Sequence, residues 1–377
     1  MEVKDLYDQK KQLYAIFTSY INSQSEFNSE FVELSKYIQN QKFRENTIRF
    51  LDFIHLLLIF AKYHRHYLYL FNKIEQILLL IKDDLKQTFT KEELLEKFFD
   101  SKIIIYFLLK NEILVIDEDI YYQLKYNNDT KILHFLYPEF KKFIDNDRTA
   151  IDVEKDLFSE DPNILVDFDK KRLQGENATY LCSIIRQDSI EKFVKYVTLY
   201  QNGIKPSIFE TNNFLLERKE NIQMIEYAAF FGSLKIFNYL RMKGAKLTPS
   251  LWLFAIHSRS PKLIHILEDC HVPLPDKLFN SVLEEAVKCH HNEFAYYIQL
   301  NNPDLIKDEY FQTISHYLYN PIDFYCFNYY NYEFLNYDCD YLDVFLFACI
   351  SNHFDLVKFL YEKIRYIKSN FLFRVFN

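Results

Sequence analysis

The sequence predicts an all-α fold: a solenoid of stacked helix-turn-helix repeats, each a pair of short helices. Three observations predict it. Between Asp5 and Ile144 the apolar residues mostly recur at three- and four-residue intervals, in long stretches without Pro or Gly, which is the helical period. Farther along, one pattern of small, apolar and turn residues returns at intervals of 27 to 31 residues. Two of the chain's 4 glycines occupy the turns of the best copy.

Residues 1–150 are predicted to form an N-terminal all-helical region with degenerate repeats. Thr90 lies three residues before Glu93, which is the spacing of a capping box, so a helix is expected to begin there. The segments ending near Leu108 and Leu136 share the apolar frame of a repeat's second helix and are 28 residues apart. The repeat pattern therefore extends into this region in weakened form.

Residues 151–177 are predicted to be an acidic connector. The stretch from Asp152 to Asp169 is rich in Asp and Glu around Pro162 and lacks a clear helical period. Two readings are open: a solvated linker, or an acidic docking strip for a basic partner. Residues 178–377 then form the main repeat domain.

The best copy of the repeat runs from Gln223 to Ala245. Ala228 lies where neighbouring first helices would approach closely, and Gly232 lies at the turn between the two helices. Gly244 follows the second helix, where a residue without a Cβ adopts the left-handed conformation at low cost. Later segments repeat this frame. The predicted structural positions are Ala228, Gly232, Leu240, Gly244, Ala255, Leu267, Ala286, Ala348 and Leu360.

The order of short helix, Gly turn, second helix and Gly-Ala exit resembles the ankyrin repeat. Together with the phrases SIFE (207–210) and SLWLFAIHSRSPKLIHILE (250–268), it resembles an ankyrin-like family of unknown function that is expanded in parasitic protists. The resemblance implies a protein-interaction repeat, with no catalytic residues to carry over. Gln223, Met224 and Glu226 stand where the ankyrin pattern has Thr, Pro and His, and the copies are short, so the hairpin fingers are expected to be short or missing.

Composition excludes several classes of function. Lys plus Arg number 45 and Asp plus Glu 53, and the resulting net charge of −8 argues against general nucleic-acid binding. The 4 glycines lack the spacing of a phosphate-binding loop, which excludes P-loop and dinucleotide-fold enzymes. The strongest apolar run, Phe53–Ala61, is too short to span a membrane. The charged N-terminal residues and 6 irregularly spaced cysteines, expected to be reduced, favour an intracellular, cytoplasmic protein, with a nuclear location also open.

The densest group of zinc-type ligands in the sequence comprises Cys270, His271, Cys289, His290 and His291. It lacks paired short spacings such as CxxC, and neither an HExxH nor a GxSxG motif occurs. One reading is that these residues are structural and that the chain has no catalytic residue, metal or cofactor. The alternative is an all-helical enzyme or metal-binding protein that uses this cluster. The sequence favours the first reading.

The sequence accordingly favours a non-enzymatic scaffold or adaptor that binds another protein through exposed first-helix and loop positions. The predicted partner-contacting residues are Glu226, Tyr227, His257, Arg259 and Lys288. The identity of the partner does not follow from these residues.

Two apolar segments give further expectations. The apolar end from Phe371 to Asn377 either folds back as a cap or promotes self-association. The aromatic segment from Tyr317 to Tyr337 is expected to pack on a degenerate repeat. Its alternatives are a hydrophobic docking patch and a stacking platform for single-stranded nucleic acid.

Overall fold

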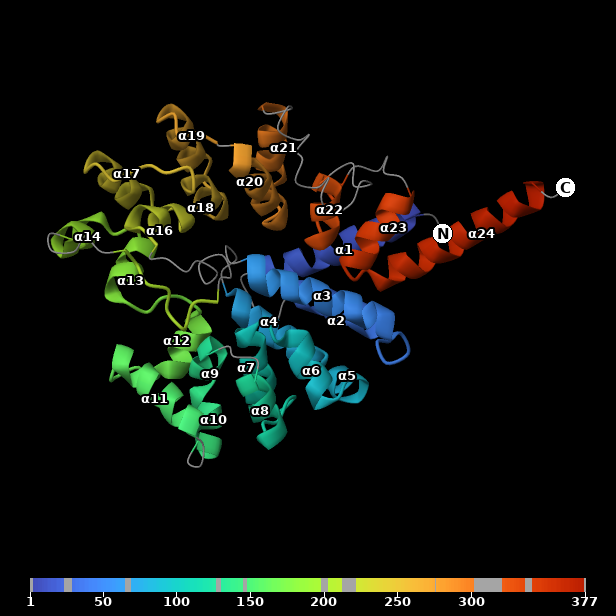
Figure 1. Cartoon of the computed structure of the whole chain (residues 1–377), viewed down its shortest axis with the longest axis horizontal. Coiled ribbons are helices and arrows are strands. Elements are labelled where there is room, and N and C mark those ends of the chain that lie inside the picture. Colours follow the sequence, from blue (N-terminus) through green and yellow to red (C-terminus); the bar gives the residue numbers. More distant parts are fainter. Residues whose placement is uncertain are drawn as a thin grey trace. The chain divides into compact units, whose positions relative to one another are not determined.

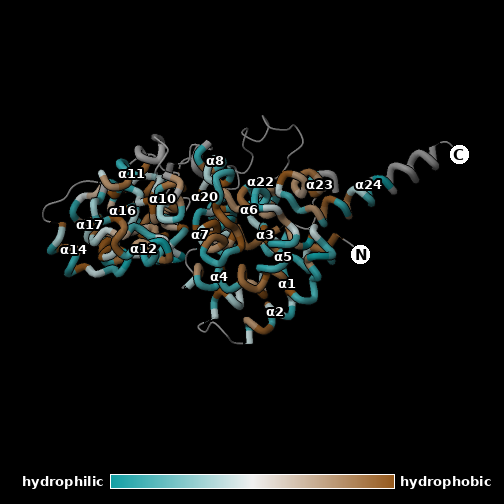
Figure 2. Tube along the Cα trace, turned by 90° about the horizontal axis from the view of Figure 1, so that it is seen from below, coloured by the Kyte–Doolittle hydropathy of each residue, from teal (hydrophilic) through white to brown (hydrophobic). Residues whose placement is uncertain are grey.

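The computed structural model describes residues 3–23, 29–64, 69–126, 130–144, 148–197, 203–211, 222–274, 276–301, 321–335 and 341–375. Over these residues the chain is all-helical (Figure 1), apart from an isolated β-bridge between Ile204 and Ile222. The predicted all-α class is confirmed. Figure 2 shows hydrophobic and hydrophilic residues alternating along the helices, as expected when one side of each helix is buried.

The chain divides into two compact units. Unit 1 comprises residues 1–59 and 246–377, and unit 2 comprises residues 60–245. The helices of unit 1 are α1 (Val3–Asn22), α2 (Ser29–Gln41), α3 (Thr47–Tyr63, whose last residues belong to unit 2), α18 (Leu251–His257), α19 (Pro261–Asp269), α20 (Asp276–Lys288), α21 (Asn292–Asn301), α22 (Pro321–Asn328), α23 (Tyr341–Ile350) and α24 (Phe354–Val375).

The helices of unit 2 are α4 (Leu70–Leu80), α5 (Lys82–Thr88), α6 (Lys91–Phe98), α7 (Lys102–Lys110), α8 (Glu118–Tyr126), α9 (Thr130–Phe135), α10 (Tyr137–Ile144), α11 (Arg148–Glu160), α12 (Phe168–Gln174), α13 (Tyr180–Arg186), α14 (Ile190–Val197), α16 (Met224–Phe230) and α17 (Leu234–Met242). The predicted capping box begins α6: the Glu93 N–H donates to the Thr90 hydroxyl, and the Thr90 N–H donates to the Glu93 carboxylate.

The acidic segment 151–177 is helical over most of its length, in α11 and α12, although an irregular stretch was expected. Val153 and Leu157 are four residues apart and both buried, and α11 contacts α9 and α10. Of the acidic residues between them, Asp156 is exposed and Glu154 accepts the hydroxyl of Tyr137 at 2.7 Å. The many acidic residues of this segment hide the one apolar stripe by which the helix packs against its neighbours.

A constant three-residue turn joins the helices of five pairs in the described part of the chain: α13–α14, α16–α17, α18–α19, α20–α21 and α23–α24. The middle residue of each turn has a positive φ. These residues are Asp188 (49°), Gly232 (68°), Arg259 (51°), His290 (54°) and Asn352 (60°). In four of these turns the third residue donates its N–H to a carbonyl five residues back, which is the Schellman arrangement.

The residue four positions before each left-handed residue packs in the core. In four pairs it is alanine, at Ala228, Ala255, Ala286 and Ala348, and each is almost completely buried. Leu240, Leu267 and Leu360 of the second helices are buried as well. Successive first helices contact each other within each unit: α13 with α16 in unit 2, and α18 with α20 in unit 1 (Figure 1).

Parts of two predicted apolar segments can be placed. In the described residues 321–335, the aromatic side chains of Tyr325, Phe327, Tyr330 and Tyr332 are buried in the core of unit 1. The rest of the aromatic segment and the side chains of the apolar C-terminal end lie outside the described residues, so self-association remains a prediction. Among the described residues, no helix combines the length and apolar character needed to cross a lipid bilayer.

Candidate functional site

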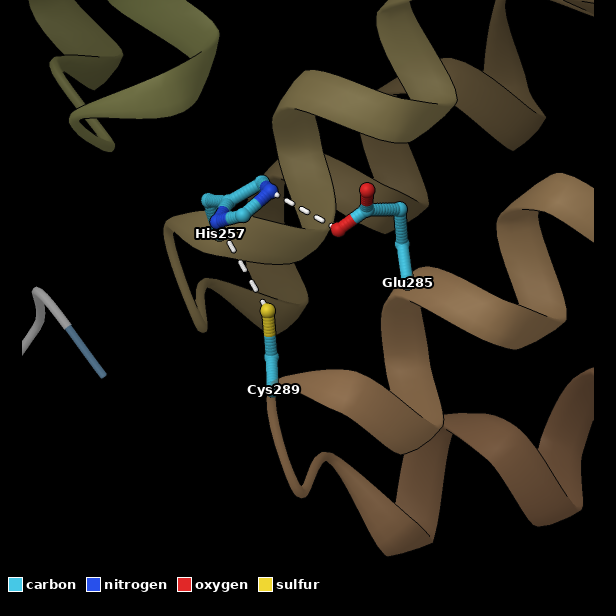
Figure 3. Close-up of side chains that lie close together, drawn as sticks. All are labelled: His257, Glu285 and Cys289. Atoms are coloured by element: carbon cyan, nitrogen blue, oxygen red, sulfur yellow. Dashed lines mark hydrogen bonds and ion pairs between the residues drawn. The ribbon is translucent and has the colours of Figure 1, made fainter. Parts of the chain in front are cut away.

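Three chemically reactive side chains meet in unit 1 where α18 contacts α20. His257 is the last residue of α18, Glu285 lies in the last turn of α20, and Cys289 follows that helix. The Cys289 N–H donates to the Glu285 carbonyl at 3.0 Å, so the helical spacing of four residues puts both side chains on one face. Figure 3 shows the His257 ring between the carboxylate of Glu285 and the sulfur of Cys289.

The His257 ring uses both of its nitrogens in this cluster. Its Nε2 lies 3.1 Å from Oε2 of Glu285, and its Nδ1 lies 3.6 Å from Sγ of Cys289. Lys288 Nζ pairs with the other oxygen of Glu285 at 2.7 Å. The side chains of His257 and Glu285 are 5% and 9% exposed, so water screens these charges only weakly.

The partners set the protonation of the cluster. Burial alone would lower the pKa of His257, but the neighbouring Cys289 sulfur and the Glu285 carboxylate raise that pKa to about 9. Burial alone would raise the pKa of Glu285, but Lys288 and His257 lower it to about 2. At neutral pH the cluster therefore holds an imidazolium beside a carboxylate.

Nitrogen, sulfur and oxygen donors at this spacing suit a borderline-soft metal ion such as zinc. Among the described residues, His257, Glu285 and Cys289 are the one group of three such side chains close enough to hold an ion, with their donor atoms within 4.8 Å of one another. Cys289, at 1% exposed, is not accessible to a macromolecular substrate.

This geometry corrects the alternative that used the five-residue cluster, because Cys289 alone of its members belongs to the group. His290 is buried, stacks on Tyr14 with ring centroids 4.3 Å apart, and hydrogen-bonds the Tyr329 carbonyl through Nε2 at 2.9 Å. Burial lowers the pKa of His290 to about 4. His291 Nε2 accepts a hydrogen bond from Arg259 at 2.6 Å. The left-handed turn after α20 sends consecutive side chains in different directions.

Cys270 and His271, the other two members, follow α19. Cys270 is partly exposed and His271 is exposed, with a positive φ of 51°. Neither belongs to the group whose donor atoms could hold an ion. His257 and Glu285 were missed as partners of Cys289. The available signal was the recurring turn, because all three residues lie one to five positions before the left-handed residue of their helix pair, Arg259 or His290.

The predicted partner-contacting residues differ in exposure. Glu226 and Tyr227 are buried, which corrects the expectation that they are exposed. The Glu226 carboxylate caps its own helix by accepting from the Gln223 N–H at 3.0 Å, and the Tyr227 hydroxyl accepts from Arg186 at 2.8 Å. His257 and Lys288 belong to the cluster above. Arg259 is exposed.

A groove of about 540 Å³ lies between the turns of α18–α19 and α20–α21. Ile256, Ile264 and Phe294 contribute apolar lining, and Tyr297 contributes an aromatic ring with a hydroxyl that donates to Glu268. The acidic side chains of the lining are Glu268, Glu293 and Glu333, and the single guanidinium is that of Arg259. Three carboxylates therefore share this groove with one guanidinium.

A second buried polar network in unit 1 was not anticipated from the sequence. Lys10 Nζ of α1 lies 2.6 Å from Oδ1 of Asp52 in α3 and 3.0 Å from Oδ1 of Asp355 in α24. Tyr330 donates its hydroxyl to Asp52 at 2.9 Å, and His353 Nδ1 lies 3.4 Å from Asp52. These contacts tie the N-terminal helices to the last helix pair. Because the polar side chains of this network bind one another, we assign the network a structural role.

In comparisons with family models, curated proteins and solved structures, nothing was found that matches this chain.

Proposed function

We propose that this chain is a non-enzymatic protein-binding scaffold built from ankyrin-like helix pairs. The observation that carries the proposal is the recurrence of one turn, with one left-handed residue at its centre, in five helix pairs. Repeat proteins of this kind stack similar units and bind other proteins through the extended surface that the stack creates. The buried alanines and the contacts between successive first helices support the same reading.

We place the binding site in the groove between the turns of α18–α19 and α20–α21. Its volume of about 540 Å³ suits a few side chains of an extended peptide rather than a whole domain. Glu293 and Glu333 are exposed on its lining, and Tyr297 and Phe294 offer aromatic surface. Carboxylates beside aromatic rings favour Lys or Arg side chains, through ion pairs and cation–π contacts. The partner is therefore proposed to present a basic segment.

The test is selection from a phage-displayed library of short random peptides with the intact chain as bait. Selected peptides are expected to be enriched in Lys and Arg, and to bind at least about 10-fold more weakly to a variant carrying Glu293→Lys and Glu333→Lys. A matched variant reverses two exposed glutamates of unit 2, Glu96→Lys and Glu191→Lys, and is expected to bind as the unchanged protein does.

Two results would overturn the proposal. One is a selection without enrichment of basic residues. The other is an equal loss of binding in the groove variant and in the matched variant, because that would show a response to net charge rather than to the groove.

A further inference from the structure

We propose that His257, Glu285 and Cys289 form a zinc-binding site. This inference goes beyond the scaffold function and uses residues that do not line the groove. The three side chains come from two neighbouring repeats, so an ion bound here would link α18 to α20.

Two of the three donor atoms already have the spacing of a zinc site. Zinc binds thiolate sulfur at about 2.3 Å and imidazole nitrogen or carboxylate oxygen at about 2.0–2.2 Å, which puts neighbouring donors of a tetrahedral site roughly 3.3–3.7 Å apart. Sγ of Cys289 and Nδ1 of His257 are 3.6 Å apart. All donor atoms of the group lie within 4.8 Å of one another. Glu285 faces Nε2 of His257 whereas Cys289 faces Nδ1, so binding one ion requires the Glu285 carboxylate to turn toward the nitrogen that the ion uses.

The charges around the cluster also suit a divalent cation. A zinc ion binds Cys289 as the thiolate and His257 as the neutral imidazole, and any proton that it displaces from these donor atoms leaves to solvent. The thiolate and the Glu285 carboxylate then neutralise its two positive charges. Lys288 holds the second oxygen of Glu285 at 2.7 Å and so orients this ligand, as outer-shell groups do in zinc sites.

The fold holds the backbone of two of these ligands in place. Glu285 and Cys289 are one helical turn apart, and Cys289 is fixed between α20 and the left-handed turn at His290. The Ala286 carbonyl accepts the His291 N–H at 2.8 Å, which closes that turn. Burial protects the site from solvent, and three protein ligands leave one tetrahedral position for water.

The experiment titrates the full-length, reduced, metal-free chain with Co²⁺, a spectroscopic probe for zinc sites. The expected result is one Co²⁺ per chain, with a thiolate-to-cobalt charge-transfer band that Zn²⁺ abolishes. Cys289→Ser is expected to remove the band. His257→Gln and Glu285→Gln are expected to weaken binding by more than about 100-fold, and Lys288→Met by about 10-fold.

Cys270→Ser is the matched control, because Cys270 lies in the same unit but outside the group. It is expected to keep the band and the affinity. Circular dichroism of each variant establishes that it is folded. Absence of a charge-transfer band in the unchanged protein would overturn the proposal, as would a band that persists in folded Cys289→Ser or disappears in Cys270→Ser. Peptide binding at the groove is measured separately, so either proposal can fail alone.

Discussion

Two buried carboxyl groups, Asp52 in unit 1 and Glu210 in unit 2, have opposite surroundings. Asp52 faces a cation, Lys10, at 2.6 Å and accepts the hydroxyl of Tyr330 at 2.9 Å. Glu210 is 1% exposed and lies beside a second buried acid, Glu176. Its Oε1 accepts the Asn177 N–H at 2.8 Å.

The comparison teaches that the partner, not the burial, decides the charge of a buried acid. Burial by itself raises the pKa of both groups. For Asp52, Lys10 and His353 outweigh burial and hold the pKa below its usual range. For Glu210, the charge of Glu176 adds to burial, so the pKa is raised well above 4.5. In the folded protein, Asp52 is therefore ionised, whereas Glu210 keeps its proton.

The largest expected effect comes from removing the cation of the Asp52 network. Lys10→Met keeps the length of the side chain but removes the ammonium group that Asp52 and Asp355 share. Loss of one member of a buried ion pair costs about 3–5 kcal/mol, because the remaining charge stays desolvated. The free energy of unfolding, measured with urea, is expected to fall by that amount.

The matched control is Lys62→Met in unit 2. Lys62 pairs with Asp100 at 2.9 Å, but Asp100 is 75% exposed, so the loss is expected to stay below about 1 kcal/mol. If both variants lost the same free energy of unfolding, the buried ion pair of Asp52 would contribute no more than an exposed one.

The next largest loss of stability is expected at Gly175. This residue contacts Thr211, the neighbour of Glu210 in the sequence. A Cβ at Gly175 would lie 2.3 Å from Cε2 of Phe71 and 2.6 Å from the hydroxyl oxygen of Thr211. Its φ of 65° adds strain for any residue with a side chain. Gly175→Ala is expected to lower the free energy of unfolding by about 3 kcal/mol.

A substitution at Gly244 separates the steric clash of an added Cβ from the strain of a positive φ. Its φ is 86°, but an added Cβ would meet nothing within 4 Å. Gly244→Ala is therefore expected to cost only the conformational strain, about 1 kcal/mol. Thermal unfolding of both variants measures the difference. A cost at Gly175 no larger than that at Gly244 would mean that Phe71 moves aside freely.

The all-α class and the positions of the recurring turns between helices could be predicted because both depend on local sequence. Ala228 and Gly232 are four residues apart, and the backbone demands of a short turn select these residue types. The exposure of Glu226 and Tyr227 could not be predicted in the same way. All the residues of α16 from Ile225 to Phe230 are buried, so this short helix has no solvent face for a periodic pattern to reveal.

The candidate site could be predicted in part. Cys289 was singled out by its residue type, but His257 is 32 residues away and joins it only when two repeats stack. The Asp52 network gave no local signal, since its hydrogen bond with Tyr330 joins residues separated by 278 positions. Contacts within a helix pair, such as the turns, have a local signal in the sequence. Contacts between the two ends of the chain depend on how unit 1 folds as a whole.

Glu210→Gln is expected to change the free energy of unfolding least. It should raise this free energy, whereas Lys10→Met lowers it. Because the folded pKa of Glu210 is raised, the unfolded chain loses this proton first as the pH rises, and stability falls above about pH 4.5. Glutamine keeps the oxygen that accepts the Asn177 N–H but carries no titrating proton. The variant is expected to be about 1–2 kcal/mol more stable than the unchanged protein at pH 7, and equally stable near pH 4. Urea unfolding across this range measures both values, with the exposed Glu191→Gln on α14 as a control expected to show no change. A stability difference that stays constant with pH would mean that Glu210 folds as an anion, as Asp52 does.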